Sequence, residues 1–156
     1  MRSDFLSYVY RIFLSTIFIV LCHQLSWMYF RQINTNVLVD LMKIFDLHVM
    51  RTSSVTFKVG NNSFLMGVSC TSIDAFIGSI PLLWKLKESW SRQIKFFTLY
   101  FLVFATINQI RLLLGFIFYE FGISWFWAHE IPSGIFLFGL FLWILQQKRW
   151  KAAPCV

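Results

Sequence analysis

Charged residues are scarce in this chain. Only 13% of its 156 residues are Asp, Glu, Lys or Arg, whereas 58% are hydrophobic and 20% are aromatic. In soluble globular domains about a quarter of the residues are charged, so the composition excludes an ordinary soluble domain. The mean hydropathy of +0.65 indicates an integral membrane protein instead.

Acidic residues and paired cysteines are also few. Seven Asp and Glu oppose fourteen Lys and Arg, which gives a net charge of +7. The basic residues stand in short clusters beside apolar runs, where they set membrane topology, so we expect no nucleic-acid partner. The three cysteines, Cys22, Cys70 and Cys155, lack the spacing of a metal site or a disulfide framework. We therefore expect no metal and consider one of them as a working thiol.

Long apolar runs dominate the rest of the sequence. Four stretches reach the roughly 20 apolar residues that a helix needs to cross a bilayer. They are residues 8–30, 64–84, 96–119 and 124–145. The sequence thus predicts an all-α membrane protein, a single domain built as a bundle of about four transmembrane helices.

The distribution of Lys and Arg predicts the orientation. Residues 85–95 contain four of them and the tail, residues 146–156, contains three, whereas residues 120–131 contain none. Because short cytoplasmic loops are enriched in Lys and Arg, both termini are expected in the cytoplasm. Residues 31–63 then form an external loop.

This external loop has a pattern of its own. Residues 37–50 place apolar side chains at helical spacing, which predicts an amphipathic helix on the membrane surface. Residues 55–59 alternate between apolar and polar, a turn follows at residues 60–62, and a second apolar run begins at Phe64. We predict a small β-hairpin before the second transmembrane helix, whose second strand could delay the start of that helix to about Cys70.

Three chemically capable residues lie at similar depth in separate segments. At about 1.5 Å per helical residue, Cys70, Arg111 and His129 lie about 21, 22 and 24 Å from the inner ends of their segments. In a hydrocarbon core about 30 Å thick, these depths fall in the outer third. Such agreement is expected if the three side chains share one pocket that faces the extracytoplasmic side.

Each of these residues also has a structural interpretation. A lone Cys70 could be a small inert hydrophobe, but Ser and Thr neighbours suggest a helix start, whose free N–H groups stabilise a thiolate. Arg111 could extend to the interface, yet with Asn108 one turn away on the same face it is expected to face a polar interior. His129 could equally be an interfacial residue beside two tryptophans.

Asp74 lies one turn inward of Cys70 on the same predicted helical face. A carboxylate at that depth needs a partner, and Arg111 is the expected one. The pair could either hold two helices together or tune the thiol. Cys22 and His23, in the first span, are interpreted as structural.

The order of these motifs resembles a known family. The stretches VSCTSI at 68–73, NQIR at 108–111 and HEIPSG at 129–134 are similar to those of the archaeosortase/exosortase family of membrane cysteine transpeptidases. In that family a Cys opens one helix, Asn-x-x-Arg lies on the next, and a His precedes the last, after a similar hairpin pattern. The likeness covers about residues 52–145. This chain departs from the family in having Ser72 where Gly is usual two residues after the Cys, and in being shorter than many members.

The resemblance implies a function. Cys70 would be the nucleophile, His129 would protonate the leaving amine, and Arg111 would stabilise the oxyanion or the thiolate, with Asn108 and Asp74 in support. The implied substrate is a membrane-anchored protein with a C-terminal sorting signal, cleaved through a Cys thioester. Water, an amine or a lipid-linked group would accept the acyl chain, and no cofactor is needed. The expected location is the cell membrane of a prokaryote.

A second hypothesis belongs to a different class. Polar residues within membrane segments also bind partner helices, so the chain could be a small non-enzymatic membrane subunit. Reactivity of Cys70 toward an impermeant thiol reagent would distinguish the two, because an inert packing cysteine does not react.

Overall fold

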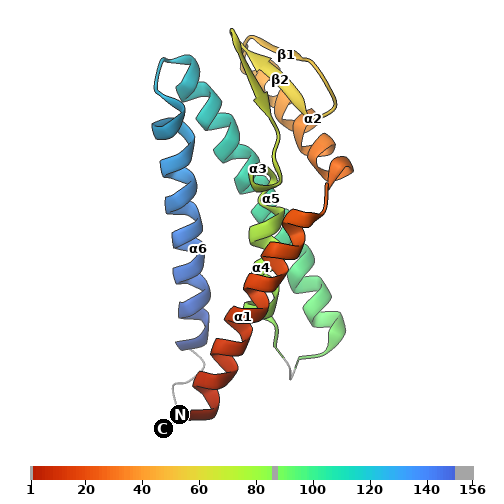
Figure 1. Ribbon diagram of the computed structural model, residues 1–156, viewed down its shortest axis with the longest axis vertical. Coiled ribbons are helices and arrows are strands. Elements are labelled where there is room, and N and C mark those ends of the chain that lie inside the picture. Colours follow the sequence, from red (N-terminus) through yellow and green to blue (C-terminus); the bar gives the residue numbers. More distant parts are fainter. Residues whose placement is uncertain (1, 86–87, 150–156) are drawn as a thin grey trace.

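The computed structural model describes residues 2–85 and 88–149 (Figure 1). The helices are α1 (Arg2–Gln24), α2 (Met28–Ile44), α3 (Val68–Thr71), α4 (Ile73–Leu83), α5 (Trp90–Glu120) and α6 (Ile131–Arg149), with a π-helix, η1 (Phe126–Glu130), directly before α6. The strands are β1 (Val49–Arg51), β2 (Thr56–Val59) and β3 (Asn62–Leu65).

Three of the described helical segments are long and apolar enough to cross a membrane. They are Leu6–Gln24, Trp90–Glu120 and Phe126–Ile144. The prediction of one continuous helix over residues 64–84 is wrong, because this stretch divides into β3, α3 and α4. The alternative start near Cys70, after a second strand, is close to the observed start of α3 at Val68. The longest piece, α4, has 11 residues, which span only about 17 Å. Ser72, with φ +54°, separates α3 from α4.

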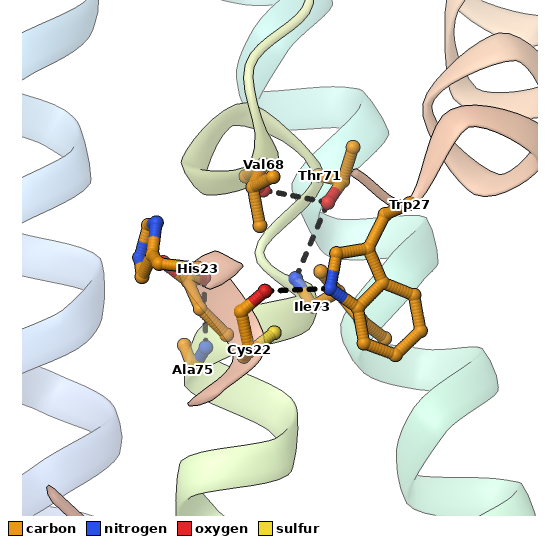
Figure 2. Close-up of polar contacts among 8 residues, drawn as sticks. Cys22, His23, Trp27, Val68, Thr71, Ile73 and Ala75 are labelled. Atoms are coloured by element: carbon orange, nitrogen blue, oxygen red, sulfur yellow. Dashed lines mark hydrogen bonds and ion pairs between the residues drawn. The ribbon is translucent and has the colours of Figure 1, made fainter. Parts of the chain in front are cut away.

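The first span ends earlier than predicted. The expected helix over residues 8–30 stops at Gln24, and Trp27 adopts a left-handed conformation with φ +48° before α2 begins. The indole N–H of Trp27 donates a hydrogen bond to the Cys22 carbonyl at 2.8 Å, which fixes the corner (Figure 2). The end of the predicted span is therefore divided between a turn at residues 25–27 and the start of α2.

The external helix also differs from its prediction. Instead of covering residues 37–50, α2 begins at Met28 and ends at Ile44, and the end of the predicted helix forms strand β1. The apolar face of α2 is buried in protein, with Leu38 and Met42 at 0% exposure, so it packs on the chain itself. The apolar residues that were predicted to lie on the membrane surface therefore belong to the protein core.

The predicted hairpin is present. Strands β2 and β3 pair antiparallel from Thr56↔Leu65 to Val59↔Asn62, around a two-residue turn at Gly60 and Asn61. Gly60 has φ +57°, which glycine adopts at little cost. Strand β1, which the sequence did not predict, extends the hairpin to a three-stranded sheet in the order β1-β2-β3.

The hydrophobic core lies at the sheet end of the molecule, between α2, the sheet and the second half of α5. Its buried residues are Leu38, Val39, Met42, Val55, Phe57, Val59, Met66, Leu112, Leu113 and Phe116. This core anchors α5 against the segment that leads from β3 into α3. The position of α3, and with it Cys70, follows from that packing.

The described ends of the chain lie together. Helix α1 begins and α6 ends at one end of the molecule, and the sheet lies at the opposite end (Figure 1). Helices α1 and α4 pack closely, since a Cβ on Gly78 would come within 2.5 Å of Ile19, and the Ser15 hydroxyl donates to the Gly78 carbonyl. Residues 150–156 of the predicted tail, including Cys155, lie outside the described residues.

Candidate active site

The three residues singled out from the sequence lie on three different elements around α5. Cys70 is the third residue of α3, Arg111 lies in the second half of α5, and His129 belongs to η1. Both α3 and η1 pack against α5. Helix α5 is therefore the common wall of the site.

The backbone around Cys70 turns sharply on both sides. Gly67 is extended before α3, and the Cys70 sulfur lies 3.9 Å from where a Cβ of residue 67 would be. On the other side, the Thr71 hydroxyl donates to the Val68 carbonyl at 2.6 Å and accepts weakly from the Ile73 N–H at 3.4 Å (Figure 2). Cys70 thus lies on a short turn of helix between two breaks, partly exposed.

Asn108 connects this turn to α5. It is fully buried, and its amide N–H donates to the Cys70 carbonyl at 2.9 Å. Its side-chain oxygen accepts hydrogen bonds from the Ser72 hydroxyl and from the Arg111 guanidinium, both at 2.8 Å. Asn108 therefore fixes the backbone of the thiol residue relative to the arginine.

Arg111 continues the connection toward η1. A second guanidinium nitrogen donates to the Ser133 hydroxyl, which in turn donates to the His129 carbonyl. The Nε of Arg111 is buried and has no hydrogen-bond partner among the described residues. A single run of hydrogen bonds thus joins α3, α5 and η1.

His129 is held in a defined orientation. It is 7% exposed, and its ring stacks on Trp125 with 4.4 Å between centroids and 12° between planes. Nδ1 lies 3.2 Å from a Glu130 carboxylate oxygen, whereas the buried Nε2 has no partner within the described part of the chain. Gly115 permits this packing, since a Cβ there would come within 3.2 Å of the Ala128 carbonyl.

A small cavity adjoins the thiol. Its volume is about 30 Å³. The lining residues are Phe57, Phe64, Leu65, Met66, Cys70, Leu112, Phe116 and Trp125. Every lining side chain other than that of Cys70 is hydrophobic, so the cavity suits an uncharged group next to Cys70. No group of three or more His, Cys, Asp or Glu capable of holding a metal occurs among residues 2–85 and 88–149.

The predicted partner of Asp74 is wrong. The carboxylate of Asp74 pairs with His23 at 2.9 Å rather than with Arg111, and its other oxygen accepts from the Ala75 N–H. The reason is that α1 packs along α4, which brings His23 over Asp74, while two guanidinium nitrogens of Arg111 donate to Asn108 and Ser133. Cys22 is 2% exposed at the same helix junction.

Three contributors to the site were missed from the sequence. They are Ser72, Gly115 and Ser133. Ser72 and Ser133 both lie in the stretches that resemble the family. Ser72 stands where the family has glycine, and its left-handed backbone is the conformation that favours glycine. Ser133 and Gly115 are ordinary helix residues, and their roles depend on contacts between elements.

Comparisons with known proteins do not assign this chain to a family. No protein-family model, curated protein or solved structure matches this chain.

Proposed function

We propose that this chain is an exosortase- or archaeosortase-like cysteine peptidase or transpeptidase of a prokaryotic cell membrane, with Cys70 as its nucleophile. The observation that supports it best is the run of hydrogen bonds from the Cys70 carbonyl through Asn108, Arg111 and Ser133 to the His129 carbonyl. Packing alone does not require a half-buried arginine between a thiol turn and a π-helix that carries a histidine, and π-helices are frequent at functional sites.

The side chains divide the chemistry among them. The Cys70 thiol passes its proton to His129, and the resulting thiolate attacks the scissile carbonyl carbon. The negative charge that develops on the carbonyl oxygen is stabilised by the Arg111 guanidinium, whose Nε has no partner among the described residues. The C–N bond then breaks as His129 gives the proton that it took from the thiol to the leaving amine. The product is a thioester on Cys70. Water completes proteolysis, whereas an amine or a lipid-linked acceptor completes transfer.

The arrangement of the helices supports a topology for this reaction. With three spans alone, the two ends of the chain would lie on opposite sides of the membrane. Helices α3 and α4 return the chain, so that α1 begins and α6 ends at the same end of the molecule (Figure 1). We infer that the segment from β3 through α4 is the fourth crossing, with both termini cytoplasmic. Cys70 then opens toward the extracytoplasmic side, where a substrate anchored by its C-terminal sorting signal would meet it.

The test is processing of a surface protein in the native host. We expect Cys70→Ala to abolish release of the C-terminal sorting signal from secreted proteins, measured by mass spectrometry of their C-terminal peptides. Cys22→Ala is the matched control, because it removes a buried thiol at the α1 corner and is expected to leave processing intact. Normal processing in the Cys70→Ala strain would exclude the proposal and favour the non-enzymatic subunit.

A further inference from the structure

Strand β3 has an open edge close to the thiol. It lies at one side of the three-stranded sheet, and within the described part of the chain it pairs with β2 alone. Two residues separate its end at Leu65 from the start of α3 at Val68. Any chain that pairs with this edge is therefore led toward Cys70.

The hydrogen-bond pattern shows which backbone groups face the open edge. The Thr56 carbonyl accepts from the Thr52 N–H at 3.0 Å, so Thr56 is turned toward β1 and away from its partner Leu65. In antiparallel strands the bonded and non-bonded pairs alternate, so the N–H and C=O groups of Ser63 and Leu65 point outward. In the described structure, no hydrogen bond from another element reaches the backbone of either residue.

The cavity beside Cys70 continues this edge. Leu65 and Met66 line it together with Cys70, and Phe64 and Trp125 form part of its wall. Its volume of about 30 Å³ exceeds the roughly 10–15 Å³ that a single water-sized group needs, which suits a small side chain. A strand on the β3 edge would pass this cavity just before it reached the thiol.

We propose that the substrate binds as a fourth strand on the β3 edge, pairing with Ser63 and Leu65, and places a small apolar side chain in the cavity against the Cys70 sulfur. This mode rests on the proposed function, because it positions the scissile bond. Addition of a strand to a sheet edge is a general way to bind extended peptides, in which the backbone supplies affinity and pockets select side chains. The outward groups of two residues suffice to align a peptide next to the thiol.

The experiment uses the purified full chain in liposomes and a tetra-alanine acyloxymethyl ketone. The Cys70 thiolate displaces the carboxylate of this probe and forms a thioether, which intact mass spectrometry quantifies. A set of isomers carries one N-methyl group on each amide in turn. We expect labelling to fall about three- to tenfold at alternate positions, those whose N–H pairs with β3, and to change little at the positions between.

Two protein variants localise the effect. Ser63→Pro removes an outward N–H from β3, and edge strands tolerate proline at such a position, so it is expected to slow labelling by the unmethylated probe. Val49→Pro is the matched control, because the same alternation places the Val49 N–H on the outer edge of β1. Iodoacetamide, which needs no strand, is expected to modify Cys70 equally in both variants.

The cavity is tested by the residue next to the reactive group. Replacing that alanine in the probe with phenylalanine or aspartate is expected to reduce labelling at least about tenfold, because the space is small and apolar. Equal labelling by the three probes would overturn the cavity assignment.

The outcomes separate the two proposals. If labelling of Cys70 does not alternate among the N-methylated probes, or if Val49→Pro slows labelling as much as Ser63→Pro, strand addition is overturned. The proposed peptidase function would still stand. If iodoacetamide modifies Cys70 but no peptide probe does, both proposals fall together. A dimer that Ser63→Pro dissociates would assign the edge to a second copy of the chain and would also overturn the inference.

Discussion

The sheet end and the helical end of this molecule are built by different rules. At the sheet end, Leu38, Met42 and Phe57 have at most 1% of their surface exposed. In the candidate spans, only 11% of the Leu6–Gln24 window and 17% of the Phe126–Ile144 window is buried. The first pattern is that of a protein core, and the second leaves side chains for lipid to cover.

The difference explains where chemistry is possible. A packed core positions residues through shape, whereas helices in lipid are held by small-residue contacts and hydrogen bonds. The polar run through Asn108 lies where the two regimes meet, on α5, which takes part in both. The core fixes the positions of α3 and α5. Contacts of η1 with α5 bring His129 to the same region.

The largest expected effect comes from truncating matched aromatic residues at the two ends. Phe57→Ala removes a ring that is 1% exposed, so we expect a loss of about 3–5 kcal/mol in the free energy of unfolding. Phe138→Ala removes one that is 63% exposed on α6, and we expect less than about 1 kcal/mol. Denaturant unfolding in detergent micelles measures both losses. Equal losses would contradict the distinction between a packed sheet end and a helical end covered by lipid.

The second largest loss in the free energy of unfolding is expected from replacing Asn108, whose hydrogen bonds connect the core to the helical end. Asn108→Leu leaves the Cys70 carbonyl and Ser72 without their partner, which we expect to cost about 2–4 kcal/mol and to slow Cys70 acylation strongly. Thr106→Val is the control, because its hydroxyl bonds only to its own helix at Leu102 and is exposed. Similar behaviour of the two variants would mean that Asn108 carries no special role.

A smaller effect is expected from the contact between α1 and α4. Gly78→Ala forces Ile19 to move, because the new Cβ would come within 2.5 Å of it, so we expect a loss of about 1–3 kcal/mol. At Gly139 on α6 an added Cβ meets nothing within 4 Å. Gly139→Ala should therefore be neutral or stabilising by up to about 1 kcal/mol. Thermal unfolding of the two variants compares them directly.

The smallest effect is expected at Ser72, whose left-handed backbone separates α3 from α4. Ser72→Ala loses the hydrogen bond to Asn108 and keeps the left-handed backbone, whereas Ser72→Gly loses the same bond but relieves the backbone. We expect Ser72→Gly to be about 1 kcal/mol more stable than Ser72→Ala. A glycine variant that is the less stable of the two would show that the conformation carries little strain.

Local patterns in the sequence predicted much of this architecture. The long apolar runs gave α1, α5 and α6, and the alternation before Gly60 gave the hairpin. Asn108 and Arg111, three residues apart, were expected on one helical face and are hydrogen-bonded there. These features depend on periodicity within one segment, which a sequence displays directly.

The parts that were missed depend on contacts between segments. The break at Ser72 shortens a predicted span to α4, and no local apolar count reveals a left-handed residue. Asp74 pairs with His23 rather than with the expected Arg111, because α1 packs on α4, a contact that no local pattern in the sequence displays. Ser133, in the first turn of α6, accepts a hydrogen bond from Arg111 on α5, a contact between residues 22 positions apart.

The most direct test of the central claim is to trap the acyl-enzyme. Membranes of the native host are quenched in acid, and the peptide containing Cys70 is analysed by mass spectrometry for a thioester. The account predicts a hydroxylamine-sensitive acyl adduct on Cys70 of the wild-type chain, lost in His129→Ala if the imidazole must protonate the leaving amine. An unmodified Cys70 in membranes that are actively processing sorting signals would contradict it.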